Sequence, residues 1–173
     1  VYREGGEIIK TQPRERMGSI DQLPYPARHL LPMNLYLEES KRSEFIMRKP
    51  SMSMISSRGC PQKCVFCTVR AVWGRDWEGR SPSNVVDEIV HLTRTYGVKE
   101  ISFLDDDLGR DIPRLSAICD EIIRRGIDIS WTVRFRVKGV DRPLLEKMKA
   151  AGCARIQFGV EQGTEEGLLR LKK

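Results

Sequence analysis

The sequence predicts an α/β fold in which strands and helices alternate, as in part of a (β/α) TIM-type barrel. Three observations predict it. Short apolar or alternating runs recur after residue 50, an amphipathic helical pattern follows each run, and Gly or Pro residues separate these segments. Repeated strand–helix units are joined by right-handed crossovers, which make the strands parallel. We therefore expect residues 51–173 to contain about four β/α units.

The first unit begins with an alternating strand over residues 51–57 and continues, after a cysteine-rich stretch, with a helix over 82–96. Ser81 is the expected N-cap of this helix, because its side-chain oxygen can accept a hydrogen bond from the first turn. Gly97 is expected to end the helix. Apolar residues recur at helical spacing and share one face: Val85, Ile89, Leu92 and Tyr96.

The other three units repeat this order. Strands are expected over 99–104, 128–134 and 154–160, and helices over 112–125, 142–151 and 165–172. Asp141 and Thr164 are the expected N-caps of the last two helices. In β/α barrels the chemistry collects at the carboxyl ends of the strands. Polar residues follow all four strands here, which indicates a site at that edge of the sheet.

Residues 1–50 lack the regular pattern of the rest of the chain. Their most distinctive segment is Leu23-Pro-Tyr-Pro-Ala-Arg, in which Pro24 and Pro26 favour an extended path. No hydrophobic period is sustained in this part. We therefore interpret residues 1–50 as a linker with a short hairpin near its start.

The length and composition indicate one globular domain. The chain has 173 residues, of which 40% are hydrophobic and 31% charged, a balance that excludes intrinsic disorder. No apolar run approaches the roughly 18 residues that a membrane span needs. The first residues also lack the apolar stretch of a signal peptide, and the cysteines are clustered rather than spread for disulfides. We expect a cytoplasmic location.

The chain carries a moderate positive charge. It has 30 Lys and Arg against 24 Asp and Glu, which gives +6. A solvated surface explains such an excess better than a nucleic-acid partner does, so nucleic-acid binding is not expected. Five of the cations lie around the cysteines, where they can attract an anionic ligand or an acidic electron donor: Arg58, Lys63, Arg70, Arg75 and Arg80.

Three of the five cysteines, Cys60, Cys64 and Cys67, form a C-x3-C-x2-C pattern. Three thiolates on one tight loop can bind three irons of a cubane cluster and leave the fourth iron open. Ferredoxin-type clusters normally take four cysteines at a different spacing. Zinc is the main alternative, but it needs a fourth ligand. The two remaining cysteines are expected in the core: Cys119 on an apolar helix stripe and Cys153 at a helix end.

This segment resembles the signature of the radical S-adenosylmethionine (SAM) superfamily. Arg58-Gly59 precedes the first cysteine, and the aromatic Phe66 stands directly before the third. The resemblance implies a [4Fe–4S] cluster on Cys60, Cys64 and Cys67 whose open iron is chelated by SAM. One electron then cleaves SAM to methionine and a 5′-deoxyadenosyl radical, which abstracts hydrogen from a substrate. Phe66 would pack beside the adenine.

The resemblance also implies roles for residues at the other strand ends. One of Asp105, Asp106 and Asp107 would meet the amino group of SAM, since a carboxylate accepts charge-assisted hydrogen bonds. The alternative is that this run caps the helix that follows it. Glu161 would hold the ribose hydroxyls, rather than being a solvated acid. Arg134 would pair with the SAM carboxylate or, equally, form a structural salt bridge.

Three further segments resemble the cobalamin (B12)-dependent branch of the superfamily: Leu23–Pro32, Arg80–Ile89 and Ala151–Glu161. That branch includes methyltransferases and the oxygen-independent cyclase that makes the fifth ring of chlorophyll precursors. Its members act on small molecules and would receive electrons from flavodoxin or ferredoxin. The resemblance implies a cobalamin-binding domain before residue 1.

Two alternatives remain open at this stage. A methylthiotransferase that acts on RNA or protein would share the cysteine signature, and a non-enzymatic zinc-binding module would share the cysteines alone. The barrel of the family has more β/α units than the four expected here, so the last strand would be left as a bare edge. We therefore expect residues 51–173 to be the amino-terminal part of a longer barrel.

Overall fold

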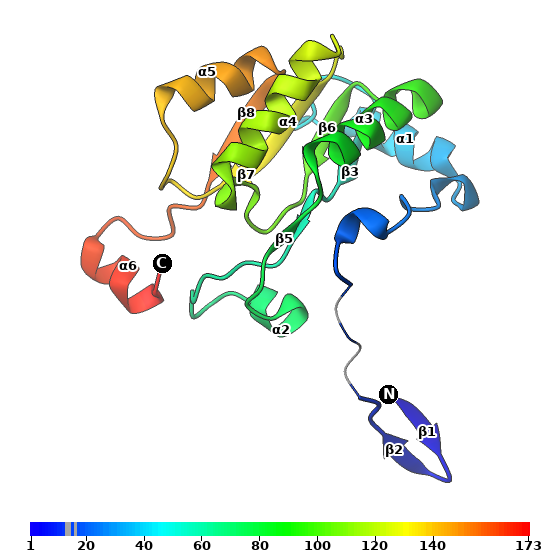
Figure 1. Ribbon diagram of the computed structural model, residues 1–173, viewed down its shortest axis with the longest axis vertical. Coiled ribbons are helices and arrows are strands. Elements are labelled where there is room, and N and C mark those ends of the chain that lie inside the picture. The colour runs from blue at the N-terminus through cyan, green and yellow to red at the C-terminus, as the bar shows by residue number, and fades with distance from the viewer. Residues whose placement is uncertain (13–14, 16) are drawn as a thin grey trace.

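The computed structural model describes residues 1–12, 15 and 17–173, and its centre is a parallel four-stranded sheet (Figure 1). The order of the strands across the sheet is the order in the chain: β3 (Ser51–Met54), β6 (Glu100–Phe103), β7 (Ser130–Phe135) and β8 (Cys153–Phe158). A helix follows each strand. The prediction of four β/α units in a partial barrel is confirmed.

Each of the four helices begins at a residue whose side chain accepts a hydrogen bond from the first turn. The helices are α3 (Pro82–Tyr96), α4 (Ile112–Arg124), α5 (Arg142–Ala150) and α6 (Glu165–Leu171). Ser81, Asp141 and Thr164 are N-caps, as predicted. The cap of α4 is Asp111, whose carboxylate accepts from the backbone of Arg114. The alternative in which the Asp105–Asp107 run caps this helix is therefore wrong.

The two faces of the sheet differ in chemistry. Side chains alternate along each strand, and those that point toward α3, α4 and α5 form the core. This helix-covered face carries Met54, Ile101, Phe103, Trp131 and Val133, each at most 4% exposed. The residues between them point the other way. We call that side the polar face, and its central residues are Ser53, Ser102, Thr132 and Arg155.

The first strand is shorter than predicted. It ends at Met54, and the chain then leaves the sheet to form a small antiparallel pair, β4 (Ser57–Arg58) with β5 (Glu78–Gly79). The intervening loop carries the three cysteines and the short helix α2 (Val69–Trp73). The strand ends at Met54 because the buried Asp105 carboxylate accepts hydrogen bonds from the backbone N–H and the hydroxyl of Ser56. These bonds hold Ser56 away from the direction of β3.

The described part of residues 1–50 contains more regular structure than the sequence analysis predicted. The predicted hairpin is present as β1 (Tyr2–Glu4) and β2 (Glu7–Ile9), and it projects away from the sheet (Figure 1). Two 3-10 turns, Ile20–Gln22 and Arg28–Leu30, and the helix α1 (Met33–Arg42) follow it. The sequence analysis did not predict α1, and the interpretation of residues 1–50 as a linker between domains stays a prediction. Part of the linker prediction, at residues 13, 14 and 16, lies outside the described residues.

The segment before α1 is anchored to α3 by buried charges. Arg28, 7% exposed, donates to one oxygen of Glu88 at 2.7 Å, and Arg80 donates to the other at 2.5 Å. The Tyr25 ring lies under the Arg80 guanidinium, and its hydroxyl donates to the Asn84 carbonyl. These contacts hold the segment firmly against the first β/α unit. No helix in the described part of the chain has the length and apolar character to cross a membrane.

Candidate cluster and cofactor site

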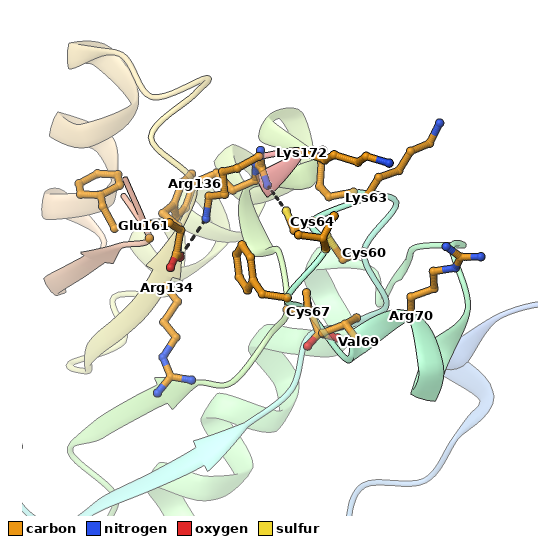
Figure 2. Close-up of a pocket in the computed structure, with 18 of the residues that line it drawn as sticks. Cys60, Lys63, Cys64, Cys67, Val69, Arg70, Arg134, Arg136, Glu161 and Lys172 are labelled. Carbon is orange, nitrogen blue, oxygen red and sulfur yellow. Dashed lines mark hydrogen bonds and ion pairs between the residues drawn. The ribbon is translucent and has the colours of Figure 1, made fainter. Parts of the chain in front are cut away.

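One cavity of about 580 Å³ lies at the carboxyl ends of the strands and gathers residues from β7, from β8 and from the segments that follow all four strands (Figure 2). Seven of the nine site residues predicted from the sequence line it: Cys60, Cys64, Phe66, Cys67, Asp106, Arg134 and Glu161. Asp105 and Asp107 lie behind its wall. Segments more than 90 residues apart therefore meet at the edge of the sheet where the sequence predicted a site.

The three cysteines of the loop are free thiols, and Cys67 is exposed. Gly59 makes the turn into the first of them with φ +84°, and a Cβ there would lie 2.0 Å from the carbonyl oxygen of Asp76. No three His, Cys, Asp or Glu side chains of the described residues converge on a single metal ion. The ligands of a cubane bind different irons and need not converge, so three free thiols around one cavity fit such a cluster.

Charged groups lie directly behind two of the thiols. An oxygen of the buried Asp107 carboxylate lies 3.9 Å from Cys60 Sγ, and Arg136 Nη1 lies 3.7 Å from Cys64 Sγ (Figure 2). Burial raises the pKa of Asp107 and of the Cys60 thiol above their ordinary values. The sequence analysis missed Arg136. Its signal was its position two residues after Arg134, at the end of the same strand.

The three aspartates after β6 have different surroundings. Asp105 is buried, and its oxygens accept from Ser56 N at 3.0 Å, Ser56 Oγ at 2.8 Å and Ser57 Oγ at 2.5 Å. It is therefore engaged with the start of the cysteine loop. Asp106 is the one that lines the cavity, and partial burial raises its pKa. Of the three, Asp106 is placed best to meet a cationic group in the cavity.

A buried arginine joins the two ends of the cysteine loop. Arg114 on α4, 9% exposed, donates through Nη2 to the Ser56 carbonyl and through Nε to the Arg80 carbonyl, each at 2.6 Å. Its guanidinium also lies over the ring of Trp77. Ser56 precedes the loop and Arg80 follows it. The Arg114 side chain therefore fixes the distance between the two ends of the cysteine loop, which we call the neck of the loop.

Glu161 lies just after β8 in an unusual backbone conformation. Its φ is +64°, which a residue with a Cβ rarely adopts, and such strain concentrates at functional sites. Its carboxylate accepts from Lys173 Nζ at 3.1 Å, and that ammonium lies 6.0 Å from the Phe66 ring centre. The end of α6 also binds the cysteine loop, since Val65 N donates to the Leu171 carbonyl.

Arg134 and the two remaining cysteines are positioned differently from these groups. The guanidinium of Arg134 points away from the thiols (Figure 2), and it forms no ion pair with another described residue. Cys119 is fully buried, and Cys153 packs against the same core, as predicted. Burial raises the pKa of both thiols to about 12. Neither lines the cavity.

Comparison with known proteins finds similarity to methyltransferases and to a ring-forming cyclase. The chain is 35% identical over 94% of its length to an uncharacterised methyltransferase of Pyrococcus horikoshii and 30% identical over 98% to cytidylyl-2-hydroxyethylphosphonate methyltransferase of Streptomyces wedmorensis. It is 29% identical over 95% to the anaerobic magnesium-protoporphyrin IX monomethyl ester cyclase of Cereibacter sphaeroides. A putative methylthiotransferase of Methanocaldococcus jannaschii is more distant, at 25% over the full chain. The chain spans about a third of the first two relatives (34% and 32%), 26% of the cyclase and 37% of the putative methylthiotransferase.

The fold has a match among solved structures. The radical SAM methyltransferase TsrM of Kitasatospora setae, solved with tryptophan and a SAM analogue, superposes on 77% of this chain and 25% of that one, with a TM-score of 0.67 and 22% identity. The model of the radical SAM superfamily matches residues 54–173, which include the cysteine loop and all of the β/α units after β3. The chain therefore belongs to the radical SAM superfamily.

Proposed function

We propose that this chain is the SAM-cleaving part of a radical SAM enzyme. Cys60, Cys64 and Cys67 would bind three irons of a [4Fe–4S] cluster, and the cavity beside them would hold SAM on the fourth iron. The observation that carries this proposal is the grouping of three free thiols with Asp106 and Glu161 around one cavity, in a chain that belongs to this superfamily.

The side chains around the cavity suit the polar ends of SAM. When bound, the cluster and SAM supply a one-electron cleavage that yields the 5′-deoxyadenosyl radical. Asp106 would accept hydrogen bonds from the amino group, and Glu161 from the ribose hydroxyls. Phe66 would pack on the adenine. Arg136 and Arg134 are the cations available to the SAM carboxylate, and Arg136 lies nearer to the thiols.

The rim of the cavity is basic, which suits an acidic electron donor such as flavodoxin or ferredoxin. Lys63, Arg70, Arg75 and Lys172 line it. Exposed charges of one sign steer an oppositely charged protein to the same place, and electron transfer needs a short path to the cluster. We therefore assign this rim to the donor.

The overall reaction we propose is B12-dependent methyl transfer to a small molecule, or the related formation of a ring. The named methyltransferases and the cyclase among the relatives support this branch over a methylthiotransferase. In this proposal a cobalamin-binding domain precedes residues 1–50, and residues 51–173 are the first part of the barrel. The segment that Arg28 anchors to Glu88 would then fix that domain relative to the cluster loop.

Anaerobic reconstitution with iron and sulfide tests the proposal. We expect a brown protein with about four irons and four sulfides per chain, whose dithionite-reduced form gives the electron paramagnetic resonance signal of a [4Fe–4S] cluster that SAM perturbs. Cys64→Ser should lose most of the iron, and Cys119→Ser, a core thiol, should retain it. A colourless protein that holds one zinc instead would overturn the proposal.

A further inference from the structure

The polar face of the sheet carries one continuous row of hydrogen-bonding side chains. Ser53 pairs in register with Ser102, Ser102 with Thr132, and Thr132 with Arg155, so the row crosses all four strands. Register partners in a parallel sheet point to the same side. The hydroxyls of Ser102 and Thr132 lie 3.4 Å apart. Three hydroxyls therefore lead across the sheet to one guanidinium.

This row is not what a packed barrel interior contains. Such interiors are filled by layers of bulky Val, Ile and Leu side chains. Here three residues of the row are small and polar and the fourth is an arginine, and a cavity of about 620 Å³ lies over them. All four residues of the row line that cavity, and its other wall includes Tyr36, Phe45 and Ile46. In the described part of the chain, this face is therefore lined by hydrogen-bond donors and borders a cavity.

The lining of this cavity includes one cation that no carboxylate of the described residues contacts. The guanidinium of Arg155 forms no hydrogen bond or ion pair with another described residue. Arg28 also lines the cavity, but it is paired with Glu88. The one carboxylate of the lining is Glu100, whose Oε2 already accepts from the backbone amides of Met47 and Arg48 and from a serine hydroxyl. Among the described cations that line this cavity, Arg155 is thus the one without a partner.

We propose that Ser102, Thr132 and Arg155, with Ser53, bind the oxyanion of a small organic substrate: a carboxylate, phosphate or phosphonate. Arg134 and Gln157 lie two residues further along the same strands and line the cluster cavity. The row is therefore about 7 Å from that cavity along the strands. A substrate held by its oxyanion would present its reacting carbon toward the cluster. This inference rests on the proposed function and specifies its substrate class.

Anion binding to the metal-free chain tests this row separately from the cluster. Inorganic phosphate, methylphosphonate and acetate are titrated into ¹⁵N-labelled protein at constant ionic strength, and amide shifts are followed. At least one of the three should bind saturably and shift the amides of Ser102 and Thr132. Arg155→Met should weaken binding about tenfold or more, and Arg155→Lys should recover part of it. The anion that binds best identifies the kind of oxyanion.

Arg142→Met is the matched control, because Arg142 is exposed at the start of α5, on the opposite side of the sheet from the row. Its binding should equal that of the unchanged chain. Equal binding by Arg155→Met with native circular dichroism, or no saturable shift with any of the three anions, would overturn the inference. Cys64→Ser should bind the anion normally, so failure of the cluster and failure of the row give different results.

Discussion

The two faces of the same four strands serve different purposes. On the helix-covered face, Ile101 and Trp131 are neighbours in register and lie in a core that excludes water. One residue further along each strand, Ser102 and Thr132 form part of the polar face. The backbone is shared, and only the side chains differ. Apolar burial on one side stabilises the fold and frees the other side from any need to be apolar.

This difference separates stability from chemistry within a single layer. The strands end in a cavity lined by thiols, carboxylates and cations, while α3, α4 and α5 supply the packing on the other side. Substitutions on the helix-covered face should therefore change the free energy of unfolding, and those on the polar face should change ligand binding. Three experiments examine this contrast, ordered from the largest expected effect to the smallest.

The largest contrast is expected between the thiols of the hydrophobic core and those of the cysteine loop. Cys119 and Cys153 pack in the core, and burial raises the pKa of both to about 12. Only the thiolate reacts with iodoacetamide, so at pH 8 roughly one Cys119 in ten thousand is reactive. The exposed Cys67 should react about a thousandfold faster in the metal-free native chain. Peptide mass spectrometry measures both rates.

The sign of the pH dependence gives a second check on these thiols. Because the pKa of Cys119 is raised, its reaction should speed up about tenfold for each pH unit between 8 and 10, as long as the fold persists. In denaturant all five cysteines should react at similar rates. Labelling of Cys119 as fast as Cys67 in the native state would contradict the assignment of Cys119 to the core.

Truncation of Trp131 should produce the next largest effect. Trp131 is 1% exposed, its ring meets Phe103 edge to face at 5.7 Å, and its Nε1 donates to the Ala151 carbonyl at 2.8 Å. Trp131→Ala should lower the free energy of unfolding by about 3–5 kcal/mol. Thr132→Val, the next residue on the other face, should change it by at most about 1 kcal/mol. Urea unfolding followed by circular dichroism compares them, and equal losses would contradict the separation of the faces.

Much of the fold was predictable because its signals are local. Ser81 and Gly97 bound α3, and the alternation of apolar residues located the three later strands within a few positions. The helix α1 was missed for a physical reason. Only Leu37 of α1 packs against the core, so the helix lacks the apolar stripe that such a search uses. The break after Met54 was missed because Asp105, about fifty residues away, causes it.

The features of the site likewise divide into those with a local sequence signal and those that depend on long-range contacts. The spacing of Cys60, Cys64 and Cys67 is a local signal and was sufficient to identify the loop. The three aspartates were indistinguishable in sequence, because their roles depend on what the folded neck of the loop presents to each of them. Arg136 was missed, since only the fold brings the end of β7 to Cys64. Local spacing thus located the ligands, and long-range contacts decide which charges surround them.

The smallest of the three effects is expected for Arg114, which joins the helix layer to the cysteine loop. Arg114 belongs to the helix layer, yet it binds the carbonyls at both ends of the cysteine loop. Arg114→Met removes two charge-assisted hydrogen bonds to buried acceptors, which should cost about 1–3 kcal/mol. Hydrogen exchange followed by mass spectrometry should show faster exchange in residues 57–80 than the loss of global stability explains, because the two ends of the loop separate locally.

The control and the conservative variant complete this test. Arg124→Met on the same helix removes an exposed pair with Glu121, and it should leave the free energy of unfolding nearly unchanged. Arg114→Lys keeps the charge, but a single ammonium does not reproduce the planar fork that reaches both carbonyls. It should therefore recover only part of the protection in the loop. If residues 57–80 exchange hydrogen equally fast in Arg114→Met and in the unchanged chain, the neck is held by the β4–β5 pairing and by Asp105 alone. The helix layer would then not stabilise the cysteine loop.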